Sequence, residues 1–528
     1  MQKPALVSVL VMLAVLAAAG SKPTESCRVT LQLVDAETGE TKAGVIQILT
    51  SDGERIPLPE LFKRGTGLDD SLSIHEWSVV PGKSIINVPA QKLTIDALSG
   101  LETERLSRIV DLTGKSEATV RLPLVRFYRR AENQQVAGNT HLHLMKLSRA
   151  DCDQYLREIP KSDDLDVLFL SYLERVGADR EYTSNNYNRD DLAALTVESG
   201  VLFGNGEEHR HNFAGFGEGY GHVMLLNIRE LIQPVSIGPG IMKTGTDGIP
   251  LTRGIQQARK DGATAIWCHN VFGFEAEPNW VLGRLDAMNI YDGGRRAGFK
   301  ERFYPLLNLG LKVPFSTGTD WFMYDFSRVY VRMDKPTTID NWLDGLSSGR
   351  SYITNGPLFR FNVDQAEIGD TLSLDRPRAV SVLGQVEGRI DFVQAEIVVN
   401  GEVVALARTR KVGNHFLAEI KQSISVNHAG WIALRIPPPN LTDTGAATPK
   451  NEFGHGLYGH TSPIYLEVGG RSAFDPRVAE ALLDQMRAAQ AAISEQGVFE
   501  SPETKARVLD VYDDAAARLE ARRESAAD

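Results

Sequence analysis

The stretch GNTHLHLMK, residues 138–146, lies where the hydrophobic pattern of the chain changes, and it carries two histidines two residues apart. Side chains at alternate positions of a strand point to the same face, so His141 and His143 would lie side by side there. Two imidazoles on one face can share a metal ion, since histidine is the commonest metal ligand. An HxH pair by itself occurs often by chance, so its meaning depends on the sequence around it.

Downstream of this stretch, apolar runs typical of buried strands alternate with helical segments up to about residue 356. DLDVLFLSY (164–172) and GATAIWCHN (262–270) are two such strands, and SRADCDQYLREI (148–159) predicts a helix with Ser148 as its N-cap. Buried strands that alternate with helices predict a parallel sheet or barrel. The roughly 220 residues of this region suit a TIM-like α/β barrel better than a small open sheet.

Short alternating strands separated by polar turns flank this region on both sides. They predict an antiparallel β-sandwich at residues 27–130 and a second β-sandwich at residues 357–470, around a barrel at residues 131–356. The turn VDAETGETKAG (34–44) is similar to that of carboxypeptidase regulatory-like modules. Residues 471–528 have helical periodicity and predict a helical tail. The expected fold is therefore multidomain, α/β plus all-β.

The N-terminal segment MQKPALVSVLVMLAVLAAAGSKP has the pattern of a secretory signal peptide. Lys3 supplies a basic start, residues 5–19 are almost wholly apolar, and Ala17–Ala19 offer small residues for cleavage. A membrane anchor is the alternative, but the apolar run is short for a span of about 20 residues. We therefore predict that residues 1–20 are a signal peptide and that the mature protein is periplasmic or secreted, with no membrane partner.

Charge and cysteine content narrow the classes of function. A net charge of -11 argues against a non-specific nucleic-acid binder, which needs a basic face. The three cysteines, Cys27, Cys152 and Cys268, are too few for a disulfide framework. Cys268 directly precedes His269, but neighbouring side chains of a strand face opposite ways. We therefore expect Cys268 to be a buried small apolar residue rather than a ligand.

Ligand-type side chains recur at the C-terminal ends of the predicted barrel strands, where barrel enzymes build their sites. Each one alone has a plain structural explanation, such as a hydrogen-bonded histidine or an aspartate that caps a helix. Their recurrence at one strand end after another makes coincidence a poor explanation. The residues concerned are His141, His143, Glu207, Glu208, His209, His211, His222, His269 and Asp320.

In this region the chain resembles the PHP (polymerase and histidinol phosphatase) superfamily of metal-dependent hydrolases, and most closely its CehA/McbA-type branch. The motifs that carry the resemblance run in order over roughly residues 130–372. They read GNTHLH, GEE, GYGH, CHN, GTD, RVYV and WLDGLSSGRSYITNGP. Each motif is weak alone, but together they are specific. The resemblance implies a distorted TIM-like (β/α)7 barrel.

The resemblance also implies which residues hold metal. The matching ligands of one ion are His141, His143, Glu208 and Asp320, and those of a second ion are Glu208, His222 and His269. Glu208 would bridge the two ions, and Glu207, one residue away, remains the alternative. Imidazole and carboxylate ligands suit divalent zinc, manganese or iron, and without a thiolate ligand softness does not choose among them.

The chain departs from trinuclear members of the family at all three places where the third metal would be held. Arg149 lies near the first place, Ser171–Tyr172 stand at the second, and Trp321–Phe322 follow Asp320 at the third. We therefore expect a dinuclear centre. The charge on a leaving group then needs another partner, and the candidates near the site in sequence are His209, Arg210, His211 and Lys243.

Two ions that share a carboxylate would activate a water near neutral pH and polarise the substrate. We expect hydrolysis of a phosphoester, or of a carbamate, ester or amide bond, in a small molecule, with Glu208, Asp320, His211 and Lys243 in catalytic roles. The alternative is a non-catalytic secreted protein that binds glycans or peptides on a degenerate barrel. The presence of every ligand of two metal sites favours the enzyme, because decay would remove ligands unevenly. The sequence leaves the substrate and the oligomeric state open.

Overall fold

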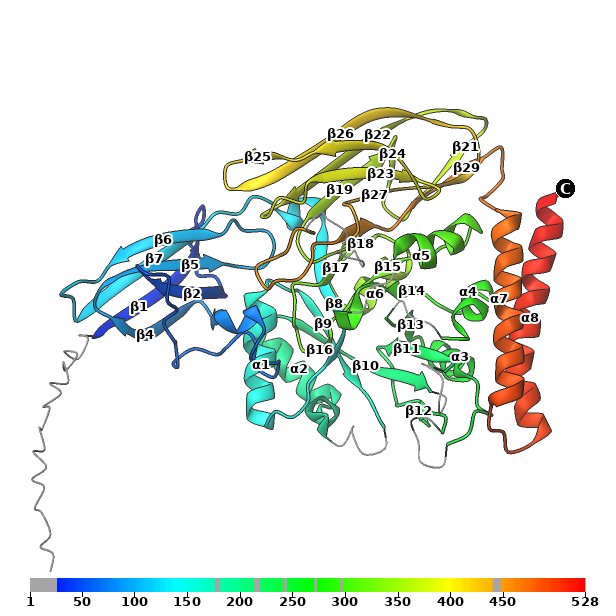
Figure 1. Ribbon diagram of the computed structural model, residues 1–528, viewed down its shortest axis with the longest axis horizontal. Coiled ribbons are helices and arrows are strands. Elements are labelled where there is room, and N and C mark those ends of the chain that lie inside the picture. The colour runs from blue at the N-terminus through cyan, green and yellow to red at the C-terminus, as the bar shows by residue number, and fades with distance from the viewer. Residues whose placement is uncertain are drawn as a thin grey trace, which may run out of the picture.

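A computed structural model of the protein describes residues 26–175, 181–212, 219–239, 241, 245–269, 273–294, 298–439 and 448–527. The predicted signal peptide, residues 1–20, and the candidate Lys243 lie outside these residues. The described chain is mixed α/β, with one large curled sheet, three smaller sheets and eight α-helices. In Figure 1 it passes from a β-sandwich through a central α/β body to a β layer and a pair of long helices. The expected combination of α/β and all-β parts is confirmed.

The N-terminal sandwich packs a three-stranded sheet against a four-stranded sheet. Its strands are β1 (Ser26–Asp35), β2 (Gly44–Thr50), β3 (Ser78–Val80), β4 (Lys83–Pro89), β5 (Lys92–Leu98), β6 (Leu106–Asp111) and β7 (Glu117–Leu124). The sheet orders are β4-β1-β7 and β3-β2-β5-β6. The β1–β7 pair is parallel, unlike the expected antiparallel pattern, because the chain crosses to the second sheet at β5 and β6 before it returns beside β1.

In the central body, helices alternate along the chain with strands of the large sheet. Its strands are β8 (Gln135–His143), β9 (Val167–Tyr172), β10 (Leu202–His211), β11 (Gly221–Leu226), β12 (Ser236–Ile237), β13 (Thr264–Trp267), β14 (Ala287–Asn289), β15 (Phe315–Ser316), β16 (Asp320–Trp321), β17 (Arg328–Arg332) and β18 (Ser351–Thr354). Its helices are α1 (Arg149–Ser162), α2 (Arg189–Ser199), α3 (Leu251–Lys260), α4 (Ala276–Val281), α5 (Phe299–Asn308) and α6 (Ile339–Ser347).

Parallel pairing brings the carboxyl ends of several of these strands to one side. The strand β8 is parallel to both β9 and β16, and β10 continues the parallel run on the other side of β9. The strands β13, β14 and β15 form a second parallel run. The strand β11 joins the two runs, because it is antiparallel to both β10 and β13. Residues that follow β8, β13 and β14 therefore meet at one mouth of the curled sheet.

Local sequence signals set the limits of the helices. Ser148 caps α1 as predicted, because its side chain accepts a hydrogen bond from the backbone N–H of Asp151. Asn188 and Asp191 form a capping box at the start of α2. That helix ends at Gly200, whose φ of 79° is the left-handed conformation that glycine adopts without strain.

A buried ion pair fixes the N-terminal sandwich to the central body. The guanidinium of Arg64, from the sandwich, has Nε 3.1 Å from Oδ1 of Asp163, which follows α1. Both side chains are fully buried. Loss of one partner would leave an uncompensated charge in the interface, so the pair holds the two parts in one arrangement.

The C-terminal β region is not a separate sandwich, because one of its two layers continues the large sheet. Its strands are β19 (Leu358–Val363), β20 (Ala366–Glu367), β21 (Thr371–Leu374), β22 (Arg378–Gly388), β23 (Gln394–Val399), β24 (Glu402–Arg408), β25 (Arg410–Val412), β26 (His415–Val426), β27 (Gly430–Arg435), β28 (Gly459–Thr461) and β29 (Ile464–Val468). The strand β28 pairs with β18 of the central body, which carries the large sheet into this region. The other layer is the five-stranded sheet β20-β19-β22-β26-β25.

The chain ends in a helical hairpin of α7 (Pro476–Gln496) and α8 (Pro502–Ala527), which lies against the central body beside α4 (Figure 1). Its apolar residues, such as Leu483 and Val508, are buried in the same core cluster as the central strands. Within the described part of the chain, the helices lack the combined length and apolar character that a membrane span requires.

Candidate metal centre

Two histidines of β8 form the first half of a buried polar cluster. His141 and His143 are 0% exposed, and their Nε2 atoms lie 2.9 Å apart because alternate strand positions face the same side. The Nδ1 of His143 lies 3.0 Å from the backbone carbonyl of Ser171 on β9. This hydrogen bond orients the ring so that its Nε2 points into the cluster.

Glu208 on β10 connects the two halves of the cluster. Its Oε2 lies 3.1 Å from Nε2 of His143, whereas its Oε1 lies 3.1 Å from Nδ1 of His222 and 3.5 Å from Nε2 of His269. The neighbouring Glu207 faces the opposite side of the strand, where it accepts a hydrogen bond from the N–H of Ile232. The structure therefore orients Glu208, and not Glu207, toward His143, His222 and His269.

Asp320 completes the first half of the cluster. Its Oδ1 lies 3.4 Å from Nε2 of His141 and 3.7 Å from Nε2 of His143. The ligand-type residues form two sets, and within each set the ligand atoms lie within 4.8 Å of one another. The first set is His141, His143, Glu208 and Asp320. The second set is Glu208, His222 and His269. These are the two sets that the family resemblance implies, and Glu208 belongs to both.

Two members of the cluster have strained backbones. The φ angles of His269 and Asp320 are 67° and 58°, in the left-handed region that side chains other than glycine rarely adopt. Such conformations cost of order 1–3 kcal/mol each and concentrate at functional sites. His269 lies two residues after β13 and Asp320 is the first residue of β16, so both reversals lie at strand ends.

Asp292 belongs to the cluster although the sequence reasoning did not select it. Its Oδ2 lies 2.7 Å from Nδ1 of His141 and 3.6 Å from Nδ1 of His269, and it also accepts a hydrogen bond from Asn289. The carboxylate thus lies behind two histidines, and its hydrogen bond orients the ring of His141. The signal was present, because Asp292 follows a strand end in the same way as His269 does.

The protonation of the cluster follows from burial and from its charges. Burial favours the neutral form of Glu208, but Arg210 and hydrogen bonds from His141 and His143 outweigh burial and hold the pKa of Glu208 well below its usual value. Burial also opposes charge on His141, yet the carboxylates of Asp292 and Asp320 raise its pKa well above normal. Burial, followed by the charge of Arg210, lowers the pKa of His222 to about 3.

The unsatisfied atoms of the cluster fit a bound cation. Oε1 of Glu208, Oδ1 of Asp320 and Oδ1 of Asp292 are buried and lack a hydrogen-bond partner among the described residues. A buried carboxylate oxygen without a donor is costly unless a positive charge is near it. Imidazole nitrogens and carboxylate oxygens are the donor set of zinc, manganese and iron sites, so the residues present could hold a metal ion.

The candidates for leaving-group stabilisation divide between the two faces of β10. Arg210 faces the cluster, with Nη1 3.7 Å from Oε1 of Glu208. His209 and His211 face the other way, in register with Glu207. The ring of His211 stacks on Tyr220, with centroids 3.7 Å apart. The structure does not bring His211 or His209 to the cluster, because strand alternation separates them from Glu208. Lys243 lies outside the described residues.

Arg149 and Trp321, at two of the departures from the family motifs, make ion-pair and aromatic contacts. Arg149 lies over the ring of Tyr187 and pairs with Asp153 at 3.0 Å. The rings of Tyr182 and Trp321 stack beside His143, with centroids 5.3 Å apart. Arg149 is thus held by other partners, and the side of His143 nearest Trp321 is apolar.

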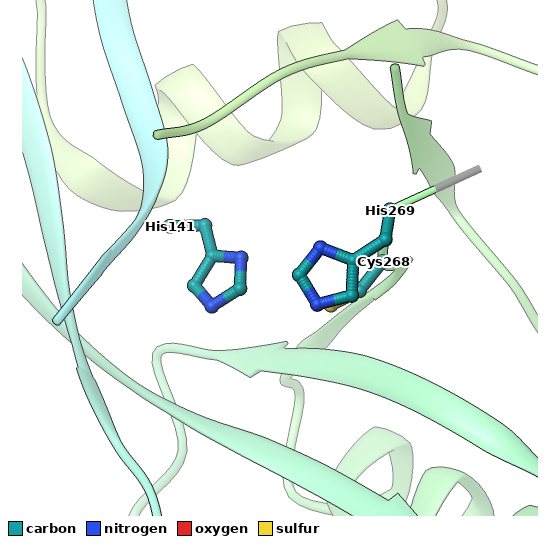
Figure 2. Close-up of side chains that lie close together, drawn as sticks. All are labelled: His141, Cys268 and His269. Atoms are coloured by element: carbon teal, nitrogen blue, oxygen red, sulfur yellow. The ribbon is translucent and has the colours of Figure 1, made fainter. Parts of the chain in front are cut away.

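Cys268 lies at the cluster as well. Figure 2 shows its side chain beside His269, opposite the ring of His141. The ligand atoms of these three residues lie within 4.8 Å of one another, and all three are buried. The expectation that Cys268 is buried is confirmed, but the alternation argument that directed its thiol away from His269 was wrong. The left-handed φ of His269 breaks the alternation at this point.

A small cavity adjoins the cluster. It has a volume of about 260 Å³ and is lined by Leu72, Tyr291, Gly293, Tyr324, Asp325, Asn355, His455, Gly456 and Tyr458. Gly293 brings the cavity next to Asp320, because a Cβ at this glycine would lie only 2.8 Å from Oδ2 of Asp320. The N-terminal sandwich, the central body and the C-terminal region all contribute to the lining.

A comparison with protein-family models finds no match for the chain, and a comparison with curated proteins finds none either.

Proposed function

We propose that the protein is a metal-dependent hydrolase with a dinuclear centre in a distorted PHP-type barrel. The observation that carries the proposal is the position of Glu208, whose two carboxylate oxygens face two different sets of histidines. A carboxylate placed in this way suits two ions that share one ligand. The convergence of six separated ligand-type residues on one buried point supports the same reading.

The residues of the cluster would have three roles, which are to bind the metal ions, to orient a ligand ring and to stabilise negative charge. His141, His143 and Asp320 would hold one divalent ion, and His222 and His269 the other, with Glu208 between them. When bound, such ions lower the pKa of a water molecule and polarise a substrate oxygen. Asp292 would orient the ring of His141. Arg210 is the cation that faces the cluster and would stabilise negative charge that develops on the substrate.

We infer a small-molecule substrate with a phosphoester, carbamate, ester or amide bond. The cavity beside Asp320, of about 260 Å³, is close in size to small-molecule pockets and far too small for a folded partner. The net charge of -11 supports neither nucleic acid nor an anionic surface as the ligand. We also propose export to the periplasm or the medium, on the basis of the signal-peptide pattern of residues 1–20.

The decisive experiment compares two neighbouring glutamates. Elemental analysis of the purified protein should find two equivalents of zinc, manganese or iron, and a chelator should remove metal together with hydrolytic activity on a panel of phosphoesters and carbamates. The Glu208→Gln variant should lose most bound metal. The matched control Glu207→Gln, one residue away on the opposite face, should keep it. Equal metal content in both variants, or ligand binding by the wild type that survives the chelator without any hydrolysis, would overturn the proposal.

A further inference from the structure

The thiol of Cys268 is the one soft donor atom at the cluster in the described part of the chain. Its Sγ lies within 4.8 Å of ligand nitrogens of His141 and His269, and the exposed fraction of Cys268 is 2%. His141 belongs to the first ligand set and His269 to the second. The thiol therefore lies near one member of each set, and Figure 2 shows it with these two rings.

Two backbone features hold the thiol in this place. The N–H of Cys268 donates to the carbonyl of His222 at 3.0 Å, which ties the residue to β11. The φ of 67° at His269 then reverses the chain, so that consecutive side chains reach the same cluster. A strained residue directly after the cysteine is hard to explain by packing alone, since a regular strand would bury the thiol equally well.

The surroundings of the thiol point to a cation. Nδ1 of His269 and Oδ1 of Asp320 are buried and have no hydrogen-bond partner among the described residues. Ligand atoms on one tetrahedral zinc ion are about 3.5 Å apart, given bond lengths of about 2.1 Å to nitrogen and 2.3 Å to sulfur. The ligand atoms of His141, Cys268 and His269 lie within 4.8 Å of one another, so the three side chains would draw closer together around a bound ion.

We propose that Cys268 is a further ligand of the metal centre and makes it selective for zinc over manganese. The inference rests on the proposed dinuclear centre and adds the identity of its ion. As the sulfur–metal bond forms, the thiol proton leaves to solvent. Thiolate ligands favour zinc over manganese, which prefers oxygen donors. The other two cysteines lie in apolar surroundings away from the cluster, with Cys27 in the N-terminal sandwich and Cys152 on α1.

Cobalt is the probe for the test, because Co²⁺ replaces zinc and gives a thiolate-to-metal charge-transfer band in the near ultraviolet when sulfur is bound. Apoprotein titrated with Co²⁺ should show this band, Cys268→Ser should bind Co²⁺ without it, and the control Cys152→Ser should keep it. Competition should show that Cys268→Ser also loses more than about tenfold of the zinc-over-manganese preference, since even outer-shell partners contribute 10–100-fold in affinity.

The outcomes separate the two proposals. Binding of Co²⁺ to the wild type without a charge-transfer band would overturn the role of Cys268 and leave the metal centre intact. Failure of the wild type to bind Co²⁺ at all would overturn the proposed function and the thiolate ligand together. The spectrum of the wild-type protein decides both questions even if Cys268→Ser does not fold, and Cys268→Ala offers a second variant.

Discussion

The Nδ1 of His141 lies 2.7 Å from Oδ2 of Asp292, and both side chains are fully buried. This contact links a candidate ligand to a carboxylate behind it. Replacement of Asp292 by Asn keeps an acceptor for the imidazole N–H but removes the negative charge. We expect the affinity for zinc to fall by about 10- to 100-fold, as for other carboxylate partners of metal-bound histidines. Competition with a chromophoric chelator measures the change.

The matched control for this variant is Asp286→Asn. Asp286 precedes β14 at the end away from the cluster, where its carboxylate accepts a hydrogen bond from Ala265. Its loss should lower stability without changing the affinity for zinc. If Asp292→Asn bound zinc as tightly as Asp286→Asn does, Asp292 would have no part in orienting His141.

Arg210 is the cation that the structure leaves beside Glu208 once His209 and His211 are placed on the other face of β10. The Arg210→Met variant keeps most of the apolar stem and removes the charge. On any substrate found to be hydrolysed, we expect kcat to fall by about 10²- to 10³-fold, the usual effect of removing one group that stabilises transition-state charge. Steady-state kinetics with saturating metal separates this loss from weaker metal binding.

The control for Arg210 is His211→Asn on the same strand. His211 packs on Tyr220 and not on the cluster, so its loss should reduce stability and leave kcat near the wild-type value. A larger drop in kcat for His211→Asn than for Arg210→Met would reverse the assignment of roles.

Much of the architecture follows from patterns that act over a few residues. Helix starts such as Ser148 and buried strands such as β9 depend on local capping and hydrophobic period, and these were predicted. The pairing of β28 with β18 was not predictable in the same way, because it joins residues about a hundred positions apart. Nothing in the period of either strand says which sheet it enters.

The same distinction between local pattern and long-range contact applies to the residues of the metal centre. Strand alternation correctly places His141 and His143 on one face of β8 and the residue between them on the other. It also places Glu207 and Glu208 on opposite faces of β10, once the direction of one of the two side chains is known. It fails at Cys268, because the left-handed φ of His269 is set by the fold around it and leaves no mark in the residue pattern. Single-residue backbone reversals are therefore the part of such a site that strand periodicity misses.

Glu275 gives a prediction about stability and pH. Its oxygens accept hydrogen bonds from the N–H groups of Leu251 and Thr252 at the start of α3, at 2.9 and 2.8 Å. Burial outweighs these bonds and raises the pKa of Glu275 from 4.5 to about 7. Between about pH 4.5 and 7 the native state holds a proton that the unfolded chain has released, so stability is lost as the pH rises through this window.

The Glu275→Gln variant should remove that loss. From pH 4.5 to 8 the free energy of unfolding of the wild type should fall by about 3 kcal/mol more than that of Glu275→Gln. Urea denaturation at several pH values measures both curves. Parallel curves for the two proteins would show that Glu275 titrates normally in the native state.

Asp247 connects the helical hairpin to the central body. Its Oδ2 accepts a hydrogen bond from the N–H of Val498 at 2.7 Å, and its own N–H donates to the carbonyl of Val498 at 2.8 Å. Val498 lies in the turn between α7 and α8. The carbonyl of Asp247 also accepts a hydrogen bond from the hydroxyl of Tyr220. One buried residue thus holds the turn of the hairpin against the strand region that carries the cluster.

We expect Asp247→Ala to lower the free energy of unfolding by about 1–3 kcal/mol, because the buried carboxylate of Asp247 and its hydrogen bond to the N–H of Val498 are lost. The hairpin should also become accessible to limited proteolysis near residues 497–501 before the central body is cut, since its anchor is local. The control is Asp510→Ala, an exposed position of α8, which should change neither quantity. Identical digestion of the two variants would mean that apolar packing of α7 and α8 alone holds the hairpin, and that the link through Asp247 adds nothing to it.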